Sequence, residues 1–161
     1  MNVTYHPVGV IHSPFTVLSQ MPIQPTGAAS APGTVELLPE YIEGLKDLDS
    51  FSHIILIYHL HQARRGPLTV TPFMDSVPRG IFATRAPSRP NPIGLSIVRL
   101  LKIEGCTLYI EALDILDGTP LLDIKPYVPA FDGHPEAVAG WLEGAQARLR
   151  STQSDGRFEG G

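Results

Sequence analysis

A proline-rich stretch in the middle of the chain, residues 79–96 (RGIFATRAPSRPNPIGLS), excludes helical structure there. Pro87, Pro90 and Pro92 fix their own φ angles and push the residues before them towards extended geometry. Pro90 and Pro92 also lack the N–H group that a sheet ladder requires. Apolar residues on both sides indicate strand ends, so we predict a stiff loop between strands. Such a loop loses little entropy on ordering and suits ligand binding; the alternative is a crossover whose arginines face water.

The rest of the chain is predicted to be mainly β. Sixteen prolines and fifteen glycines indicate many turns and short strands rather than a helical bundle. The runs that favour strands are residues 5–13, 34–38, 51–62, 68–73, 95–103, 107–115 and 120–124. Residues 39–48 indicate a helical turn, Asp117-Gly118 is a two-residue hairpin signal, and a helix is predicted from His134 onward. The most economical architecture is a small β-barrel of about seven short strands with a C-terminal helix.

Length and composition predict one domain in a reducing compartment. We expect a single domain over residues 1–150 and a flexible tail over residues 151–161. The lone Cys106 cannot form an intrachain disulfide, and the N-terminus shows no signal-peptide pattern. No apolar run is long enough for a membrane span. These features favour a cytoplasmic protein that does not associate with membranes.

Charge is distributed unevenly along the chain, although the net charge is only −4. Between residues 64 and 102 the single acid is Asp75, whereas the stretches on either side are acidic. The basic residues of this middle block are Arg64, Arg65, Arg79, Arg85, Arg89, Arg99 and Lys102. Such a block predicts one positive face of the kind that binds phosphate or RNA. The alternative is that folding interleaves the three blocks and the field cancels.

A row of polar residues is predicted near the end of the last strand. In an extended segment the period of two places Asp123, Lys125 and Tyr127 on one face. An acid, an amine and a phenol on one face can move a proton or hold a polar substrate, although a solvated face has the same pattern. Just upstream, Asp114 and Asp117 lie on either side of the start of the predicted turn.

Two histidines raise the question of a metal. His59 and His61 share one face of a predicted strand, as metal ligands do in some small barrels, and His53 lies further along that face. A third ligand is not evident nearby, so hydrogen-bonded structural histidines are favoured and no metal site is predicted. The two commonest glycine-rich loops for nucleotide phosphates are both absent from the sequence.

Three segments together resemble the TsaA-like, or TrmO, family of S-adenosylmethionine-dependent tRNA N6-methyltransferases. They are FSHIILIYHLHQ, the proline-rich stretch, and DILDGTPLLDIKPYVPAFD, and the similarity extends over residues 8–132. The resemblance implies a small β-barrel, a homodimer and S-adenosylmethionine bound without a Rossmann domain. It also implies methylation of N6 on threonylcarbamoyladenosine beside the anticodon of a tRNA.

The resemblance also implies site residues. By position, the cofactor site would include Pro22, Ile23, Gln24, His61, Gln62, Arg85, Arg89, Asn91, Leu95, Asp114, Ile115, Leu116 and Asp117. Asp114 or Asp117 would face the sulfonium cation. Asp123 or Tyr127 would accept the N6 proton, with Lys125 lowering the pKa of a neighbour.

Two features depart from the family pattern. Ile23 stands where the typical P-R-Q loop carries a cationic contact, and one helix and a short tail replace the extra C-terminal domain of longer members. These departures leave open a methyl acceptor that is another adenine-like or small molecule. Two further classes of protein also stay open: a metal-dependent barrel enzyme that uses His59 and His61, and a non-catalytic barrel that binds RNA or a metabolite.

Overall fold

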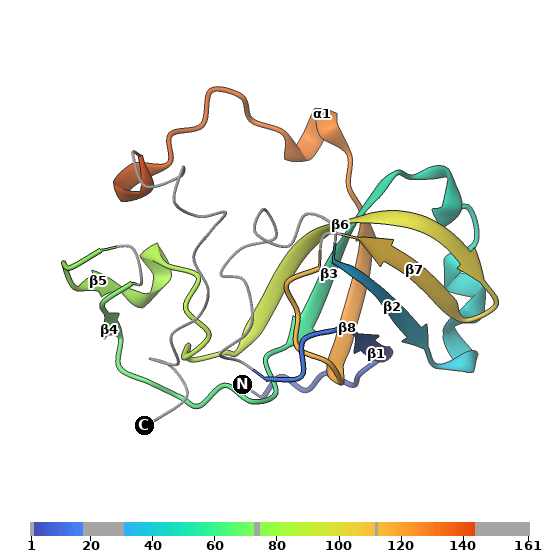
Figure 1. Cartoon of the computed structure of the whole chain (residues 1–161), viewed down its shortest axis with the longest axis horizontal. Helices are drawn as coiled ribbons and strands as arrows, with labels where there is room; N and C mark the ends of the chain where they lie inside the picture. Colours follow the sequence, from blue (N-terminus) through green and yellow to red (C-terminus); the bar gives the residue numbers. More distant parts are fainter. Residues whose placement is uncertain (1, 18–30, 73–74, 112, 144–161) are drawn as a thin grey trace.

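A computed structural model of the chain describes residues 2–17, 31–72, 75–111 and 113–143. Within these ranges six antiparallel strands close into a barrel (Figure 1). The order round the barrel is β1 (Gly9–His12), β2 (Pro32–Leu37), β7 (Thr107–Glu111), β6 (Ile93–Glu104), β3 (His53–His59) and β8 (Thr119–Pro126). Pairing between β8 and β1 closes the ring, which confirms the predicted small β-barrel.

Alternate residues of the strands form the core of the barrel. In β3 the side chains of Ile54, Leu56 and Tyr58 are buried, whereas their neighbours along the strand are half-buried or exposed. Because successive side chains of a strand point to opposite faces, each strand contributes both to the core and to the outer surface. The core residues that are almost completely inaccessible include Ile11, Val35, Ile54, Leu56, Val98, Leu108, Ile110 and Leu121.

Strand β6 carries the end of the proline-rich stretch into the barrel wall. It pairs with β3 without interruption, from His53 opposite Arg99 to His59 opposite Ile93. On its other side it forms the predicted hairpin with β7, which turns at Gly105 with a φ of 59°, a conformation that favours glycine. The strand begins at Ile93, two residues before the predicted start.

A small ribbon outside the barrel leads into the proline-rich loop. Strands β4 (Thr69–Val70) and β5 (Arg79–Gly80) pair with each other and with no barrel strand (Figure 1). The next three residues were expected to be extended, but they form the 3-10 turn η5 (Ile81–Ala83). The N–H group and the hydroxyl of Thr84 both donate to the carbonyl oxygen of Ile81 and close this turn. The loop therefore starts from a fixed turn rather than from a strand end.

Short helical turns complete the described fold. Between β2 and β3 the chain forms the 3-10 turns η3 (Pro39–Leu45) and η4 (Leu48–Ser50), which confirms the helical turn predicted over residues 39–48. Within the described ranges, no helix combines the length and the apolar content that a membrane span requires.

The predicted C-terminal helix is wrong over the residues that the structure describes. The helix α1 (Pro129–Asp132) is a single turn that ends before residue 134, and a 3-10 turn, η6 (Gly140–Leu142), follows. Gly140 has a φ of 59°, which interrupts a right-handed helix. Val138, which lies within the predicted helix, is 79% exposed. The end of the predicted helix lies outside the described residues.

The turn at Asp117-Gly118 is present, with a φ of 76° at Gly118, but it does not join paired strands. Strand β7 ends at Glu111 rather than at residue 115, and β8 pairs with β1 and β3 instead of β7. The physical reason is that the chain leaves the sheet so that Leu113 and Ile115 can pack into the core. The predicted hairpin between these strands is therefore wrong.

The C-terminal segment folds back onto η5. After α1 it runs towards the β4–β5 ribbon (Figure 1), and Trp141 Nε1 donates a 2.8 Å hydrogen bond to the carbonyl oxygen of Ala83. The guanidinium of Arg79 lies over the Trp141 ring, 5.4 Å from its centroid, and forms a 2.6 Å ion pair with Asp75. These contacts fix the position of η5, which leads directly into the proline loop.

Candidate active site

The proline loop (residues 84–92) is held in shape by hydrogen bonds within itself. The guanidinium of Arg89 donates to the carbonyl oxygens of Thr84 and Ala86, at 3.0 and 3.2 Å. The N–H group of Arg89 also donates to the carbonyl oxygen of Pro87 at 2.8 Å. Arg89 was expected to contact the cofactor. Because these bonds all lie within the loop, its geometry fits a role in shaping the loop better than a role in direct contact.

The end of the proline loop is attached to the barrel. The N–H group of Leu60, just after β3, donates to the carbonyl oxygen of Pro92 at 2.8 Å. The N–H group of Ile93 donates to the carbonyl oxygen of Asn91, also at 2.8 Å. The side chains of Arg85 and Asn91 remain exposed on this fixed loop, where they are accessible to a ligand.

A buried polar cluster lies inside the barrel, next to the point where the proline loop enters β6. Tyr58 of β3 and Ser96 of β6 point inwards, and their hydroxyl oxygens are 3.0 Å apart. Ser96 Oγ donates a 2.9 Å hydrogen bond to Asp114 Oδ1. Asp114 was predicted from the sequence, whereas Tyr58 and Ser96 were missed. A usable signal existed, because a serine at an inward position of an apolar strand must find a partner.

The carboxyl group of Asp114 has an altered acidity. Burial raises its pKa to about 6, whereas the hydrogen bond from Ser96 and the positive charge of Arg85 act in the opposite direction. Burial also raises the pKa of Tyr58, and the charge of Asp114 adds to this effect. Tyr58 therefore remains a neutral hydrogen-bond donor, and Asp114 is ionised at neutral pH but is protonated in mild acid.

Asp117, the second predicted carboxylate, is engaged in structural bonds. Its Oδ1 accepts a 3.1 Å hydrogen bond from the N–H group of Ser13 and lies 3.2 Å from Nδ1 of His12. The bond from Ser13, followed by His12, holds the pKa of Asp117 below its usual value. Between the two aspartates Ile115 and Leu116 are buried in the structure. Asp117 thus fastens the chain after β1 to the turn before β8.

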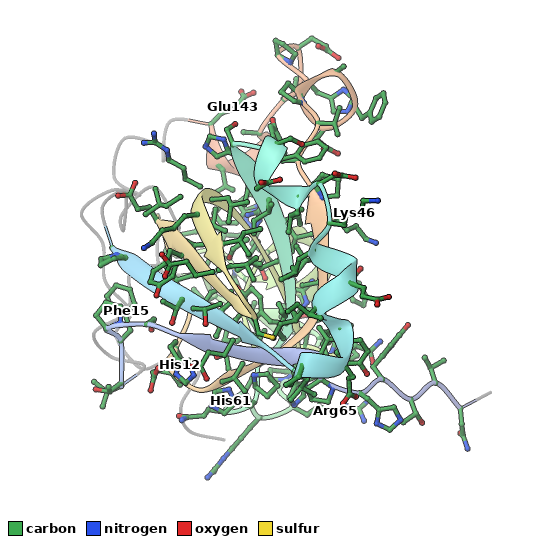
Figure 2. The ribbon with its side chains drawn as sticks, turned by 90° about the vertical axis from the view of Figure 1, so that its right-hand side faces the viewer. His12, Phe15, Lys46, His61, Arg65 and Glu143 are labelled. Atoms are coloured by element: carbon green, nitrogen blue, oxygen red, sulfur yellow. The ribbon has the colours of Figure 1, made fainter. Side chains whose placement is uncertain are left out.

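His61 lies at the same end of the barrel as His12 (Figure 2). Its Nδ1 is 3.4 Å from Thr119 Oγ1, which itself donates to the carbonyl oxygen of Leu116. Partial burial lowers the pKa of His61, and the neighbouring His59 contributes to the same shift. The side chain of Gln62 is exposed. In the part of the chain that the structure describes, no group of three or more His, Cys, Asp or Glu is arranged to hold a metal ion.

The predicted row Asp123, Lys125 and Tyr127 lies on the outside of the barrel wall. Asp123 is opposite Ile57 in the register of β8 and β3, and Lys125 is opposite Ile55, so both point away from the core. Lys125 Nζ and Asp123 Oδ2 form a 2.8 Å ion pair. The barrel wall therefore separates this row from the buried hydroxyl groups of Tyr58 and Ser96.

An apolar stripe runs along the outer face of β6. Its members are Ile93, Leu95 and Ile97, whose exposed fractions range from 40% to 52%; Arg99 follows on the same face and separates them from the exposed Leu101. Ile57 of β3 is opposite Leu95, and Ile55 is opposite Ile97, which widens the stripe onto the next strand. Leu95, a predicted cofactor residue, thus belongs to an exposed apolar surface.

The basic block is partly neutralised by folding. Arg79 pairs with Asp75 (2.6 Å), Arg99 with Glu111 (3.8 Å) and Lys102 with Glu104 (2.8 Å). Arg65 and Arg85 are exposed on the segments that precede and form the proline loop. The positive surface is therefore narrower than the count of basic residues in the sequence suggested.

The structure brings together only some of the predicted cofactor residues. Arg85 and Asp114 interact electrostatically, and Asp117 and His61 lie on the segments at the same end of the barrel. Pro22, Ile23 and Gln24 lie outside the described residues. A carboxylate that is largely buried, next to an arginine on a stiff loop, is suited to a small ligand that carries charges of both signs. The fold and site thus define a barrel that binds a polar small molecule.

Comparison with known proteins narrows this class. Residues 10–133 match the family model of the tRNA-methyltransferase O N-terminal domain. The chain is 54% identical over 156 residues to a Pyrococcus abyssi protein named as a probable S-adenosyl-L-methionine-binding protein, covering 97% of this chain and 85% of the relative. It is 36% identical over 153 residues to the Escherichia coli tRNA (adenine(37)-N6)-methyltransferase, covering 89% of this chain and 65% of that enzyme.

A solved structure agrees with these sequence matches. The crystal structure of TrmO from Pseudomonas aeruginosa superposes with a TM-score of 0.74 at 43% identity, covering 88% of this chain and 63% of that one. The chain thus spans slightly less than two thirds of the length of this bacterial protein and of the Escherichia coli enzyme. The chain belongs to the tRNA-methyltransferase O family, as the resemblance in its sequence indicated.

Proposed function

We propose that this chain is an S-adenosylmethionine-dependent methyltransferase that acts on N6 of an adenosine beside the anticodon of a tRNA. The acceptor nucleoside in this proposal is threonylcarbamoyladenosine. The observation that carries the proposal is the family match over residues 10–133, which spans the proline loop and the Asp114 cluster. The names of relatives from Pyrococcus abyssi and Escherichia coli support the cofactor and the reaction, respectively.

The residues at the end of the barrel fit this cofactor chemically. S-adenosylmethionine carries a sulfonium cation, an amino group and a carboxylate, so its site needs charges of both signs. Asp114 offers a carboxylate in surroundings where burial strengthens electrostatic attraction, and Arg85 offers a cation on a fixed loop. When bound, S-adenosylmethionine supplies an electrophilic methyl group. The protein has to orient the acceptor nitrogen in line with that group and to remove a proton.

The proton acceptor is a further part of the proposal. Asp123 and Tyr127 are the candidates, and Lys125 already holds Asp123 through their ion pair. This row is on the outer face, the same side of the wall as Leu95, because Ile57 is opposite both Leu95 and Asp123. If Asp123 or Tyr127 accepts the proton, the adenine of the tRNA must therefore approach over the outer surface of the barrel.

The proposed reaction can be tested directly. Purified protein incubated with S-adenosylmethionine and tRNA from cells lacking the enzyme should add one methyl group to one nucleoside of the tRNA. Mass spectrometry of the digested tRNA should show the product only when the starting tRNA carries threonylcarbamoyladenosine. Methylation of tRNA that lacks this modification would contradict the proposed acceptor. Absence of any methylated nucleoside, with S-adenosylmethionine binding intact, would contradict a tRNA substrate.

We also propose that the protein is a homodimer. We place it in the cytoplasm, where it would act on tRNA. The support is the apolar stripe of β6, because an exposed apolar row marks a contact surface and a two-fold axis would cover the same row on both copies. Sedimentation should give a dimer at micromolar concentration, and Ile97→Lys should convert it to a monomer. The matched variant Val138→Lys, which changes an exposed apolar residue outside the barrel, should remain dimeric. A monomeric wild type would refute this assembly.

A further inference from the structure

Two buried hydroxyl groups connect the interior of the barrel to Asp114. Ser96 Oγ donates to Asp114 Oδ1 at 2.9 Å, and Tyr58 Oη lies 3.0 Å from Ser96 Oγ. A serine hydroxyl has only one proton, which is committed to the carboxylate, so Tyr58 must be the donor in the second bond. The chain of hydrogen bonds therefore has one direction, from Tyr58 through Ser96 to Asp114. The ionised carboxylate of Asp114 therefore receives a hydrogen bond from Ser96.

Tyr58, the first donor in this series of hydrogen bonds, is held in a fixed position. Only 6% of Tyr58 is exposed, and its ring packs on Gly94, where a Cβ atom would overlap the ring carbons Cε2 and Cζ. Ser96 is 2% exposed. Among the described residues that are not exposed, no buried side-chain nitrogen or oxygen lacks a hydrogen-bond partner. The series of hydrogen bonds from Tyr58 through Ser96 to Asp114 is thus complete. Loss of one of these side chains leaves a buried polar group without a hydrogen-bond partner in a poorly hydrated site.

The two neighbouring aspartates differ in what they can offer a ligand. The Oδ1 atom of Asp117 is occupied by the N–H group of Ser13 and by His12. Asp114 receives its side-chain bond from inside the barrel, from Ser96, and the charged group that acts on it is Arg85 of the proline loop. The groups that face Asp114 are therefore Tyr58 of β3, Ser96 of β6 and Arg85 of the loop.

We propose that Tyr58 and Ser96 are positioning residues that hold Asp114 ionised and oriented to receive the positive charge of S-adenosylmethionine. This inference rests on the proposed function and adds to it the residues that prepare the carboxylate. Gly94 belongs to the same arrangement, because the Tyr58 ring occupies the space where its side chain would be. Gly94, which follows the prolines, thus leaves space for the Tyr58 ring that helps to position Asp114.

Binding of the cation is then linked to a proton. The pKa of Asp114 is about 6 in the free protein, so the carboxylate is charged above this pH and becomes neutral below it. The affinity for S-adenosylmethionine should therefore be close to full about one unit above pH 6, and it should fall as the pH drops through 6. Ser96 lowers the pKa of Asp114, and its removal must move the midpoint to higher pH.

The first experiment measures Asp114 without any cofactor. The carboxyl carbon of Asp114 is followed by ¹³C NMR from pH 4 to pH 8 in the wild type and in Ser96→Ala. The midpoint should rise by about one pH unit in Ser96→Ala, because a hydrogen bond to the charged form is lost. Tyr58→Phe should raise it by less, since Ser96 can still donate. Ser96→Thr, which keeps a hydroxyl, should restore the wild-type midpoint. Unchanged midpoints in Ser96→Ala and Tyr58→Phe would overturn the positioning role.

The second experiment measures the affinity for S-adenosylmethionine by calorimetry over the same pH range. With the midpoint raised by about one unit, the affinity of Ser96→Ala should fall about twofold at pH 7 and about fivefold at pH 6, and its pH profile should follow the new midpoint. The matched variants Ser52→Ala and Tyr109→Phe, which change hydroxyls on the outer surface, should keep both values. A uniform loss of affinity without a moved profile would overturn the inference. Failure of the wild type to bind at any pH would instead overturn the proposed function on which it rests.

Discussion

Gly94→Ala is expected to destabilise the fold by about 1–3 kcal/mol, because overpacking of a filled core has this cost. A Cβ atom at this position would overlap two carbons of the Tyr58 ring and lie 2.8 Å from a third, Cδ2. The ring cannot move aside freely, since it is buried and its hydroxyl is bound to Ser96. For a domain of this size the midpoint of thermal unfolding should fall by about 3–10 °C.

Thermal unfolding followed by circular dichroism measures this effect. Gly44→Ala is the matched control, because no atom lies within 4 Å of a Cβ atom there, and its midpoint should hardly change. In the double variant Gly94→Ala/Tyr58→Val the steric part of the loss should disappear, so the two changes should be non-additive. Equal unfolding midpoints for Gly94→Ala and the wild type would show that the barrel adjusts at this position.

Arg85→Ala is expected to weaken the binding of S-adenosylmethionine by about ten- to hundredfold, the size of a lost charged hydrogen bond. The side chain is exposed on a loop that Arg89 and the prolines keep rigid, so its loss should change the site more than the fold. Arg85 also lowers the pKa of Asp114. Without it less of the carboxylate is ionised near pH 7, and the loss of affinity should grow as the pH falls.

Calorimetry at pH 7.5 and pH 6 separates the two contributions of Arg85. Lys46→Ala removes a cation from the segment between β2 and β3, at the end of η3, and should leave the affinity unchanged (Figure 2). An unfolding midpoint close to the wild-type value would show that Arg85→Ala keeps the fold. Equal affinity of Arg85→Ala and the wild type at both pH values would remove the proline loop from the cofactor site.

The local backbone of the site could be predicted from the sequence, because a few residues determine it. Three prolines in six residues exclude both a helix and a central strand, and the structure has a loop there. The barrel could also be predicted, since β-branched strands without intervening helices have few other ways to bury one face. These features depend on residues that are close together in the chain.

The pairing of distant residues could not be predicted. Tyr58 and Ser96 are 38 residues apart, and their contact depends on the register between β3 and β6, which no local pattern specifies. The hairpin expected at Asp117-Gly118 failed for the same reason, since the dipeptide specifies a turn but not the partner of the next strand. The predicted C-terminal helix failed over the described residues: residues 133–139 form no helix, and Gly140 then adopts a left-handed conformation that a hydrophobic pattern does not reveal.

The chain contains a single tryptophan, and its indole group rests on the residue that ends η5. Trp141 bonds to Ala83, two positions before Arg85, and lies beneath the guanidinium of Arg79. Its emission spectrum thus comes from one known place in the molecule. A shift of the proline loop on ligand binding would alter the hydrogen bond to Ala83 or the stacking of Arg79. Either change would alter the wavelength and intensity of the Trp141 emission. The protein therefore carries its own optical reporter, and stopped-flow mixing could time the arrival of the cofactor without any attached dye.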